Sequence, residues 1–196
     1  MTVGSAISLA GGQAFAISNC TFTNNHAGSN SGGAVFYQQA IGQEGELRVE
    51  GSVFSGNSGS TGGAIYHFGS KLIVTDSAFL DNTVTNYGGA IFIYKVGYAG
   101  VASFTNSLFL ANTAQVAGGA VYSVQDLIVT NFTACALAYN SCGSGGGGAF
   151  TALGGEHSMS HVVLLDNAAK NGGALYISSS VDLDSVTFVG NNATNG

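Results

Sequence analysis

The segment Phe79-Leu80-Asp81-Asn82, followed after five intervening residues by Gly88-Gly89-Ala90-Ile91-Phe92, contains the pattern that decides the fold. A phrase of the form Phe-x-x-Asn, then Gly-Gly-Ala-apolar, recurs along the whole chain. Copies begin at Phe22, Phe54, Phe79, Phe109, Leu137 and Leu164, and the first half of a seventh begins at Phe188. The asparagines stand 24 to 32 residues apart. This period is typical of a solenoid with one coil per repeat.

Three short segments of the third repeat have the features of β-strands, namely Leu72–Thr75, Ser77–Phe79 and Gly89–Ile93. Paired glycines in every repeat exclude long helices. The sequence therefore predicts an all-β chain, a right-handed parallel β-helix of about seven coils with three short strands per coil. We expect residues 1–196 to form one domain, with loops at one edge where the insertions Gln39–Glu46 and Tyr94–Gly100 follow the third strand.

Reading equivalent positions down the repeats gives columns of one chemical type. The phenylalanine position is apolar in every copy, as an inward-facing stack requires. Five residues earlier lies a second apolar column: Ile17, Val49, Val74, Phe104, Phe132, Met159 and Leu183. Two residues before the phenylalanine the side chains are small, which suits a tight corner.

The asparagine position has no exception. Stacked amides about 4.8 Å apart can bond to one another and to turn backbone, and asparagine tolerates the left-handed conformation that turns need. We interpret this column as a structural ladder of Asn25, Asn57, Asn82, Asn112, Asn140, Asn167 and Asn191. The glycines are expected to allow unusual dihedral angles and close approach of neighbouring coils.

These two coupled phrases resemble the repeats of the chlamydial polymorphic outer-membrane protein family, from about Ala14 to Asn191. The resemblance implies a secreted or autotransported β-helical passenger whose usual role is adhesion. The chain shows neither a signal peptide nor a C-terminal membrane barrel. We therefore expect it to be a fragment of a longer solenoid or surface protein, located extracellularly or at the cell surface.

The composition excludes several kinds of partner. Charged residues make up 7% of the chain, against roughly 25% in ordinary soluble domains. The chain has a net charge of −6, and its four basic residues are scattered along the sequence. Nucleic acids and anionic lipids need clustered cations, so we expect no nucleic-acid binding and no membrane contact by this segment.

Catalysis is not expected, although many β-helices act on polysaccharides. Glu46, Arg48 and Glu50 alternate on one strand, as do Asp182 and Asp184, but neither set has a basic partner at the matching column of an adjacent coil. His157 and His161 are four residues apart on strand-like sequence, where this spacing does not converge as it does on a helix. We therefore predict no catalytic residue, metal site or cofactor.

One column is a candidate binding face. If the residue before it points inward, Phe36, Tyr66, Phe92, Tyr122 and Tyr176 point outward, where they would stack on sugar rings or a partner protein. The alternative is an aromatic ladder that only stabilises the sheet.

Asn19, Asn131 and Asn192 are candidate glycosylation sites in hosts that modify Asn-x-Ser/Thr. Cys135 and Cys142 either pair across one coil or remain small buried thiols.

The sequence thus predicts a non-catalytic extracellular structural or adhesive β-helix module. Its partners would be surface glycans or other protein, through self-stacking or flanking domains. The alternative is a subunit of an extracellular filament assembled end to end, because open coil ends expose unpaired backbone. A polysaccharide-active enzyme is the least favoured reading.

Overall fold

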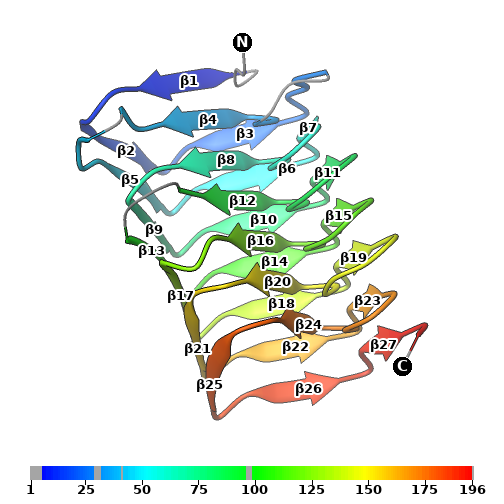
Figure 1. Ribbon diagram of the computed structural model, residues 1–196. Helices are drawn as coiled ribbons and strands as arrows, with labels where there is room; N and C mark the ends of the chain where they lie inside the picture. The colour runs from blue at the N-terminus through cyan, green and yellow to red at the C-terminus, as the bar shows by residue number, and fades with distance from the viewer. Residues whose placement is uncertain (1–5, 29–31, 41, 96–98, 196) are drawn as a thin grey trace.

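A computed structural model describes residues 6–28, 32–40, 42–95 and 99–195. Within these residues the chain has no helix and 27 strands, all of which pair in parallel. Each coil visits four sheets in turn, which we name sheets A, B, C and D, and then begins the next coil (Figure 1). The chain is therefore a parallel β-helix, as the repeat predicts.

Sheet A carries the residues that follow the glycine pairs. Its strands, in spatial order, are β1 (Ile7–Ala10), β4 (Val35–Gln38), β8 (Ile65–Phe68), β12 (Ile91–Tyr94), β16 (Val121–Val124), β20 (Phe150–Leu153) and β24 (Leu175–Ile177).

Sheet B carries the longest strands. They are β2 (Ala14–Ser18), β5 (Glu46–Glu50), β9 (Lys71–Thr75), β13 (Gly100–Thr105), β17 (Ile128–Thr133), β21 (Glu156–Ser160) and β25 (Ser180–Asp184).

Sheet C carries the phenylalanine column, in β3 (Thr21–Thr23), β6 (Val53–Ser55), β10 (Ala78–Leu80), β14 (Leu108–Leu110), β18 (Ala136–Ala138), β22 (Val163–Leu165) and β26 (Thr187–Val189).

Sheet D has two-residue strands that follow the asparagines. They are β7 (Ser58–Gly59), β11 (Thr83–Val84), β15 (Thr113–Ala114), β19 (Ser141–Cys142), β23 (Ala168–Ala169) and β27 (Asn192–Ala193).

Three sheets have seven strands and the fourth has six, so the expected number of about seven coils is close. The expected three strands per coil is wrong, because sheet D is a fourth. The strands of sheet D have two residues each, too few to show an alternation of apolar and polar side chains in the sequence. They are defined by hydrogen bonds between successive coils. The Thr83 N–H, for example, donates to the carbonyl of Asn57 at 3.0 Å.

The direction of winding can be followed in Figure 1. The strands of sheet A run leftward in front, and the paler strands of sheet C run rightward behind, while the chain descends from the N-terminus. This is the right-handed sense, which β-crossovers strongly prefer. The insertions fall between sheets A and B, at one edge as expected, although residues 41 and 96–98 of these loops lie outside the described part.

The core is a set of stacked columns inside the coils. The phenylalanine column is in strict register from Phe22 through Phe109 to Phe188. Neighbouring rings stack face to face, with centroids 4.7 to 5.0 Å apart from Phe22 to Phe109. The second apolar column also aligns as expected, from Ile17 to Leu183. Apolar burial in these columns supplies the main driving force for stacking.

The asparagines form a continuous hydrogen-bonded column beside this core. The Asn82 amide nitrogen Nδ2 donates to Asn112 Oδ1 at 2.9 Å and to the carbonyl of Phe54 at 3.0 Å. Asn112 Oδ1 also accepts the backbone N–H of Asn82, at 3.1 Å. The same amide-to-amide bond joins all seven asparagines. Five of them are buried, from Asn57 to Asn167, so the ladder satisfies polar groups that water does not reach.

Left-handed backbone is found one residue before each ladder asparagine rather than at the asparagine itself. The residues with positive φ there are Asn24, Gly56, Asp81, Ala111, Tyr139, Asp166 and Gly190. Each ladder asparagine must keep the same backbone conformation for its side chain to reach the next coil. The left-handed conformation of the turn is therefore adopted by the residue before it.

The glycine pairs have two different roles. The first glycine has positive φ in four repeats, as at Gly88 (+65°). The second allows close approach, because a Cβ on Gly89 would overlap the carbonyl oxygen of Gly119 in the next coil. Both expected roles of glycine are therefore present.

We predict that Asn112→Ala lowers the free energy of unfolding by about 2–5 kcal/mol, because it removes the shared acceptor of two Asn82 donors and leaves buried groups without partners. Urea denaturation followed by circular dichroism measures this change. Asn86→Ala is the matched control, because Asn86 is exposed and lies outside the ladder. Equal losses in the two variants would contradict an energetic role for the ladder.

Candidate functional site

The outer face of sheet A carries two parallel columns of side chains. In β12, Ile91 and Ile93 belong to the core, whereas Phe92 and Tyr94 lie on the opposite face. The same alternation in each coil aligns Phe36, Tyr66, Phe92 and Tyr122 in one column. It aligns Gln38, Phe68, Tyr94, Val124 and Leu153 in a second column.

The first column points outward as expected, but most of it is covered. Phe36, Phe92 and Tyr122 are only 4%, 8% and 6% exposed. Tyr87, which precedes a glycine pair, packs its ring 4.8 Å from Tyr122, and the rings of the column stack on one another. These three side chains therefore expose little surface to a partner, and the expectation of a binding face along this column stays a prediction. Tyr66 is half-buried and Tyr176 is 40% exposed.

The second column was not predicted from the sequence. Its aromatic side chains are more exposed to solvent than Phe36, Phe92 and Tyr122 in the first column. Phe68 and Tyr94 are half-buried, and their rings stack with centroids 5.4 Å apart. With Phe36, Gln38 and Tyr66 they line a cavity of about 140 Å³. The available signal was an aromatic residue two positions after Tyr66 and Phe92. At the second of these positions, Tyr94, we expected an insertion loop to begin.

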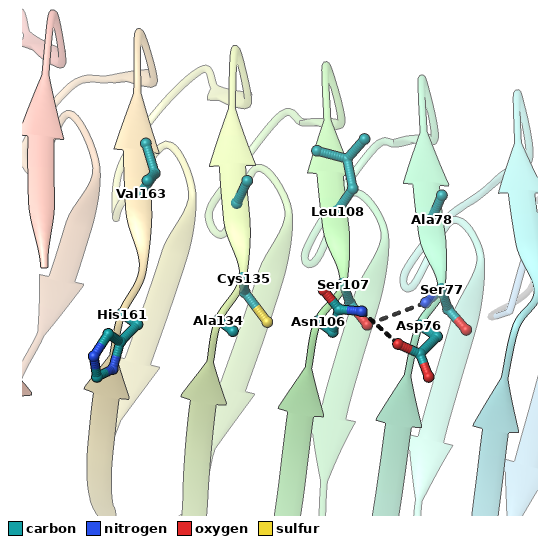
Figure 2. Close-up of a pocket in the computed structure, with 11 residues that line it drawn as sticks. Asp76, Ser77, Ala78, Asn106, Ser107, Leu108, Ala134, Cys135, His161 and Val163 are labelled. Carbon is teal, nitrogen blue, oxygen red and sulfur yellow. Dashed lines mark hydrogen bonds between the residues drawn. The ribbon is translucent and has the colours of Figure 1, made fainter. Parts of the chain in front are cut away.

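A shallow groove runs across several coils at the corner between sheets B and C (Figure 2), with a volume of about 530 Å³. Its corner residues Asp76, Asn106, Ala134 and His161 all have positive φ. Asn106 Nδ2 donates to Asp76 Oδ1 at 2.5 Å. The other side is aliphatic, formed by Ala78, Leu108, Ala136 and Val163. This arrangement offers a surface for contact and no activated nucleophile.

The small residues two positions before each phenylalanine form a second hydrogen-bonded ladder beside this groove. The backbone N–H of Ser52 donates to Ser77 Oγ at 3.1 Å, and that of Ser77 donates to Ser107 Oγ at 3.3 Å. Cys135 continues the column, and burial raises the pKa of its thiol. Cys142 lies in sheet D and is also a free buried thiol, so the alternative of a Cys135–Cys142 bridge is not realised.

The acidic residues are partly paired across coils, contrary to expectation. Glu46 Oε2 lies 2.9 Å from Lys71 Nζ, its direct neighbour on the next strand, and Glu46 Oε1 lies 2.8 Å from Arg48 Nη2. These contacts lower the pKa of Glu46. The expectation failed because the predicted strand Leu72–Thr75 leaves out Lys71, which is the first residue of β9. This exposed ion pair stabilises little and is no catalytic acid pair.

The two histidines of the i, i+4 pair are separated by the strand geometry. His157 is buried, with Nε2 2.9 Å from the carbonyl of Gly154, and burial lowers its pKa. His161 is exposed at the following corner. Among the described residues no group of three or more His, Cys, Asp or Glu side chains converges on a point that suits a metal ion.

The candidate glycosylation sites all lie on the outside of the coils. Asn19 is exposed at a corner, Asn192 is exposed in β27, and Asn131 accepts a hydrogen bond from Ser158 Oγ at 2.8 Å. Their modification stays a prediction.

Comparison with known proteins relates these coils to one repeat family. The model of the Chlamydia polymorphic membrane protein repeat matches residues 19–38, 51–67 and 76–94. Each match starts at the corner before sheet C and runs through the asparagine and sheet D to sheet A. These matches cover the two phrases that carry the predicted resemblance.

Three coils of this chain are similar to the polymorphic membrane protein repeat.

A relative with this repeat type is the probable outer membrane protein pmp20 of Chlamydia pneumoniae, which is 29% identical over 188 residues. The alignment covers 87% of this chain and 11% of the relative, so the chain spans about a tenth of that protein's length. No solved structure matches this chain significantly. The described residues contain no helix long and apolar enough to cross a bilayer.

His67 is a second buried histidine, besides His157, and it lies in the core of the coils. His67 is 1% exposed, stacks on Tyr37, and donates from Nε2 to the Lys71 carbonyl at 3.2 Å. Its Nδ1 has no hydrogen-bond partner among the described residues. Burial lowers the pKa of His67 to about 3, so the ring stays neutral.

We predict that stability falls as the pH is lowered from 6.5 to 5. An unfolded histidine takes up a proton near pH 6.5 and folded His67 does not, so the slope is up to about 1.4 kcal/mol per pH unit. Urea midpoints measured across this range test it. His67→Phe keeps the ring stacked on Tyr37 and should flatten the slope. His161→Phe, at an exposed corner, is the matched control, and an unchanged slope in His67→Phe would contradict the assignment.

Proposed function

We propose that this chain is a non-catalytic cell-surface β-helix module that adheres through the outer face of sheet A. The observation that carries the proposal is the half-buried second column, where Phe68 and Tyr94 line a cavity with Phe36, Gln38 and Tyr66. The two rings stack on each other on the outer face, where a flat partner can pack against them. The Chlamydia pneumoniae relative is named as a probable outer membrane protein, and this supports the surface location.

A sugar ring is the partner that fits this face best. Aromatic faces pack on the C–H bonds of a pyranose ring, and the Gln38 amide offers both a donor and an acceptor to hydroxyl groups. Rigid support comes from the strands beneath, because Ile65, Ile91 and Ile93 fix the backbone from the core side. The β-helix thus acts as a stiff scaffold that presents the face without a conformational change.

The purified chain should bind a subset of immobilised surface glycans, and Phe68→Ser with Tyr94→Ser should weaken binding about tenfold or more. A glycan array with fluorescently labelled protein measures this. Leu108→Ser is the matched control, because Leu108 is 36% exposed on the outer face of a different sheet. No glycan binding, or equal loss in the control, would refute adhesion through sheet A.

A further inference from the structure

The outer face of sheet C is aliphatic over four consecutive strands. The middle residue of each strand belongs to the buried phenylalanine column, so the first and third residues face outward. In β10, β14, β18 and β22 all of these outward residues are apolar: Ala78, Leu80, Leu108, Leu110, Ala136, Ala138, Val163 and Leu165. The core and the asparagine ladder need only the residue between them. We name this surface the aliphatic stripe.

Large and small side chains alternate along the first column of the stripe. In register across five coils, the column reads Val53, Ala78, Leu108, Ala136 and Val163. Leu108 is 36% exposed and Val163 is 41% exposed, and with the two alanines they line the groove of about 530 Å³ at the corner between sheets B and C (Figure 2). Coils lie about 4.8 Å apart, so the two alanine positions lie about 9.6 Å apart. The column thus offers two seats for apolar side chains at a fixed spacing.

The dimensions of the stripe fit one α-helix. A three-residue strand is about 10 Å long, and the five coils from Val53 to Val163 span about 20 Å. This area of about 200 Å² is far below the roughly 800 Å² that each partner contributes to a stable interface between folded proteins. An α-helix is about 10–12 Å across, and its residues i and i+7 share one face about 10.5 Å apart, close to the spacing of the alanine seats.

Exposed carboxylates border the stripe on both sides. Asp76 lies at the corner before sheet C, and Asp81 and Asp166 follow the last residues of β10 and β22 at the corner after it. None of the ion pairs found among the described residues includes these three. The basic side chains nearby are His161, at the first corner, and Lys170, beyond β23. The rim is therefore acidic, and it favours a partner with cations on both sides of its apolar face.

We propose that the aliphatic stripe docks one basic amphipathic α-helix of another protein, with apolar side chains seated at Ala78 and Ala136 and Lys or Arg side chains toward the acidic rim. The strands of sheet C pair between coils, so the face offers no backbone groups to an extended peptide, whereas a helix satisfies its own. A second copy of this chain would bring the same carboxylates, which repel. The groove shares no residue with the aromatic cavity on sheet A, so failure of one proposal does not decide the other.

The test uses a fluorescently labelled synthetic helix with one leucine stripe and lysines on both sides of it, titrated with the chain and followed by anisotropy. We expect saturable binding of one helix per chain. Leu108→Ser with Val163→Ser should weaken it about tenfold or more. Asp81→Asn with Asp166→Asn should weaken it less and reduce its dependence on salt, because asparagine keeps the positive φ found at both positions. Phe68→Ser with Tyr94→Ser, and the exposed Asp126→Asn, are the matched controls.

Two control peptides separate the apolar and the ionic contributions, once circular dichroism shows that each variant keeps the wild-type fold. One has the same composition with its leucines spread around the helix, and the other has glutamate in place of every lysine. Both should bind about tenfold more weakly. Absence of saturable binding by the basic helix overturns the proposal. Equal binding of the first control peptide, or unchanged binding to Leu108→Ser with Val163→Ser, overturns the apolar seat. Equal binding of the glutamate peptide overturns the role of the rim, and a loss confined to Phe68→Ser with Tyr94→Ser places the helix on sheet A instead.

Discussion

The register in which one coil lies on the next is the constraint on which the rest of the structure depends. Every backbone group that pairs between coils does so along the helix axis, so each side chain stands directly above its equivalent in the preceding repeat. The asparagine ladder fixes this register from inside, because Asn82 Nδ2 and its backbone N–H both bind one oxygen, that of Asn112. A shift by one residue would break both bonds and turn the Phe79 column away from the core.

This constraint makes the inside uniform and leaves the outside free to vary. The phenylalanine column stays apolar in every coil, and Phe54, Phe79 and Phe109 lie face to face in it. The residue types in an outward column are restricted only by contacts with neighbouring side chains on the same face. Sheet A thus gathers aromatic side chains, and the outer face of sheet B gathers ions such as Glu46 and Lys71. Recognition on such a scaffold is expected at outer faces and corners.

The corners also show where a repeat pattern stops being informative. The position of each loop was predictable from the length of the insertion after sheet A. Its contents were not, because Lys95 and Gln39, which follow the aligned residues Tyr94 and Gln38, are joined through Ser70 by hydrogen bonds that the repeat pattern does not contain. The covering of Phe92 and Tyr122 by Tyr87 was hidden for the same reason, since Tyr87 occupies a turn position that varies between repeats.

The sequence by itself determined the repeat, the parallel β-helix, the inward columns and the asparagine ladder, because identical coils leave only one way to bury the same apolar residues repeatedly. Tertiary structure alone decided the fourth sheet, the left-handed position before each ladder asparagine, and the exposure of each outward aromatic. These depend on atoms from neighbouring coils: the two-residue strand at Thr83 is defined by its hydrogen bond to the coil before it, and the burial of Phe92 by a ring that lies outside its own strand.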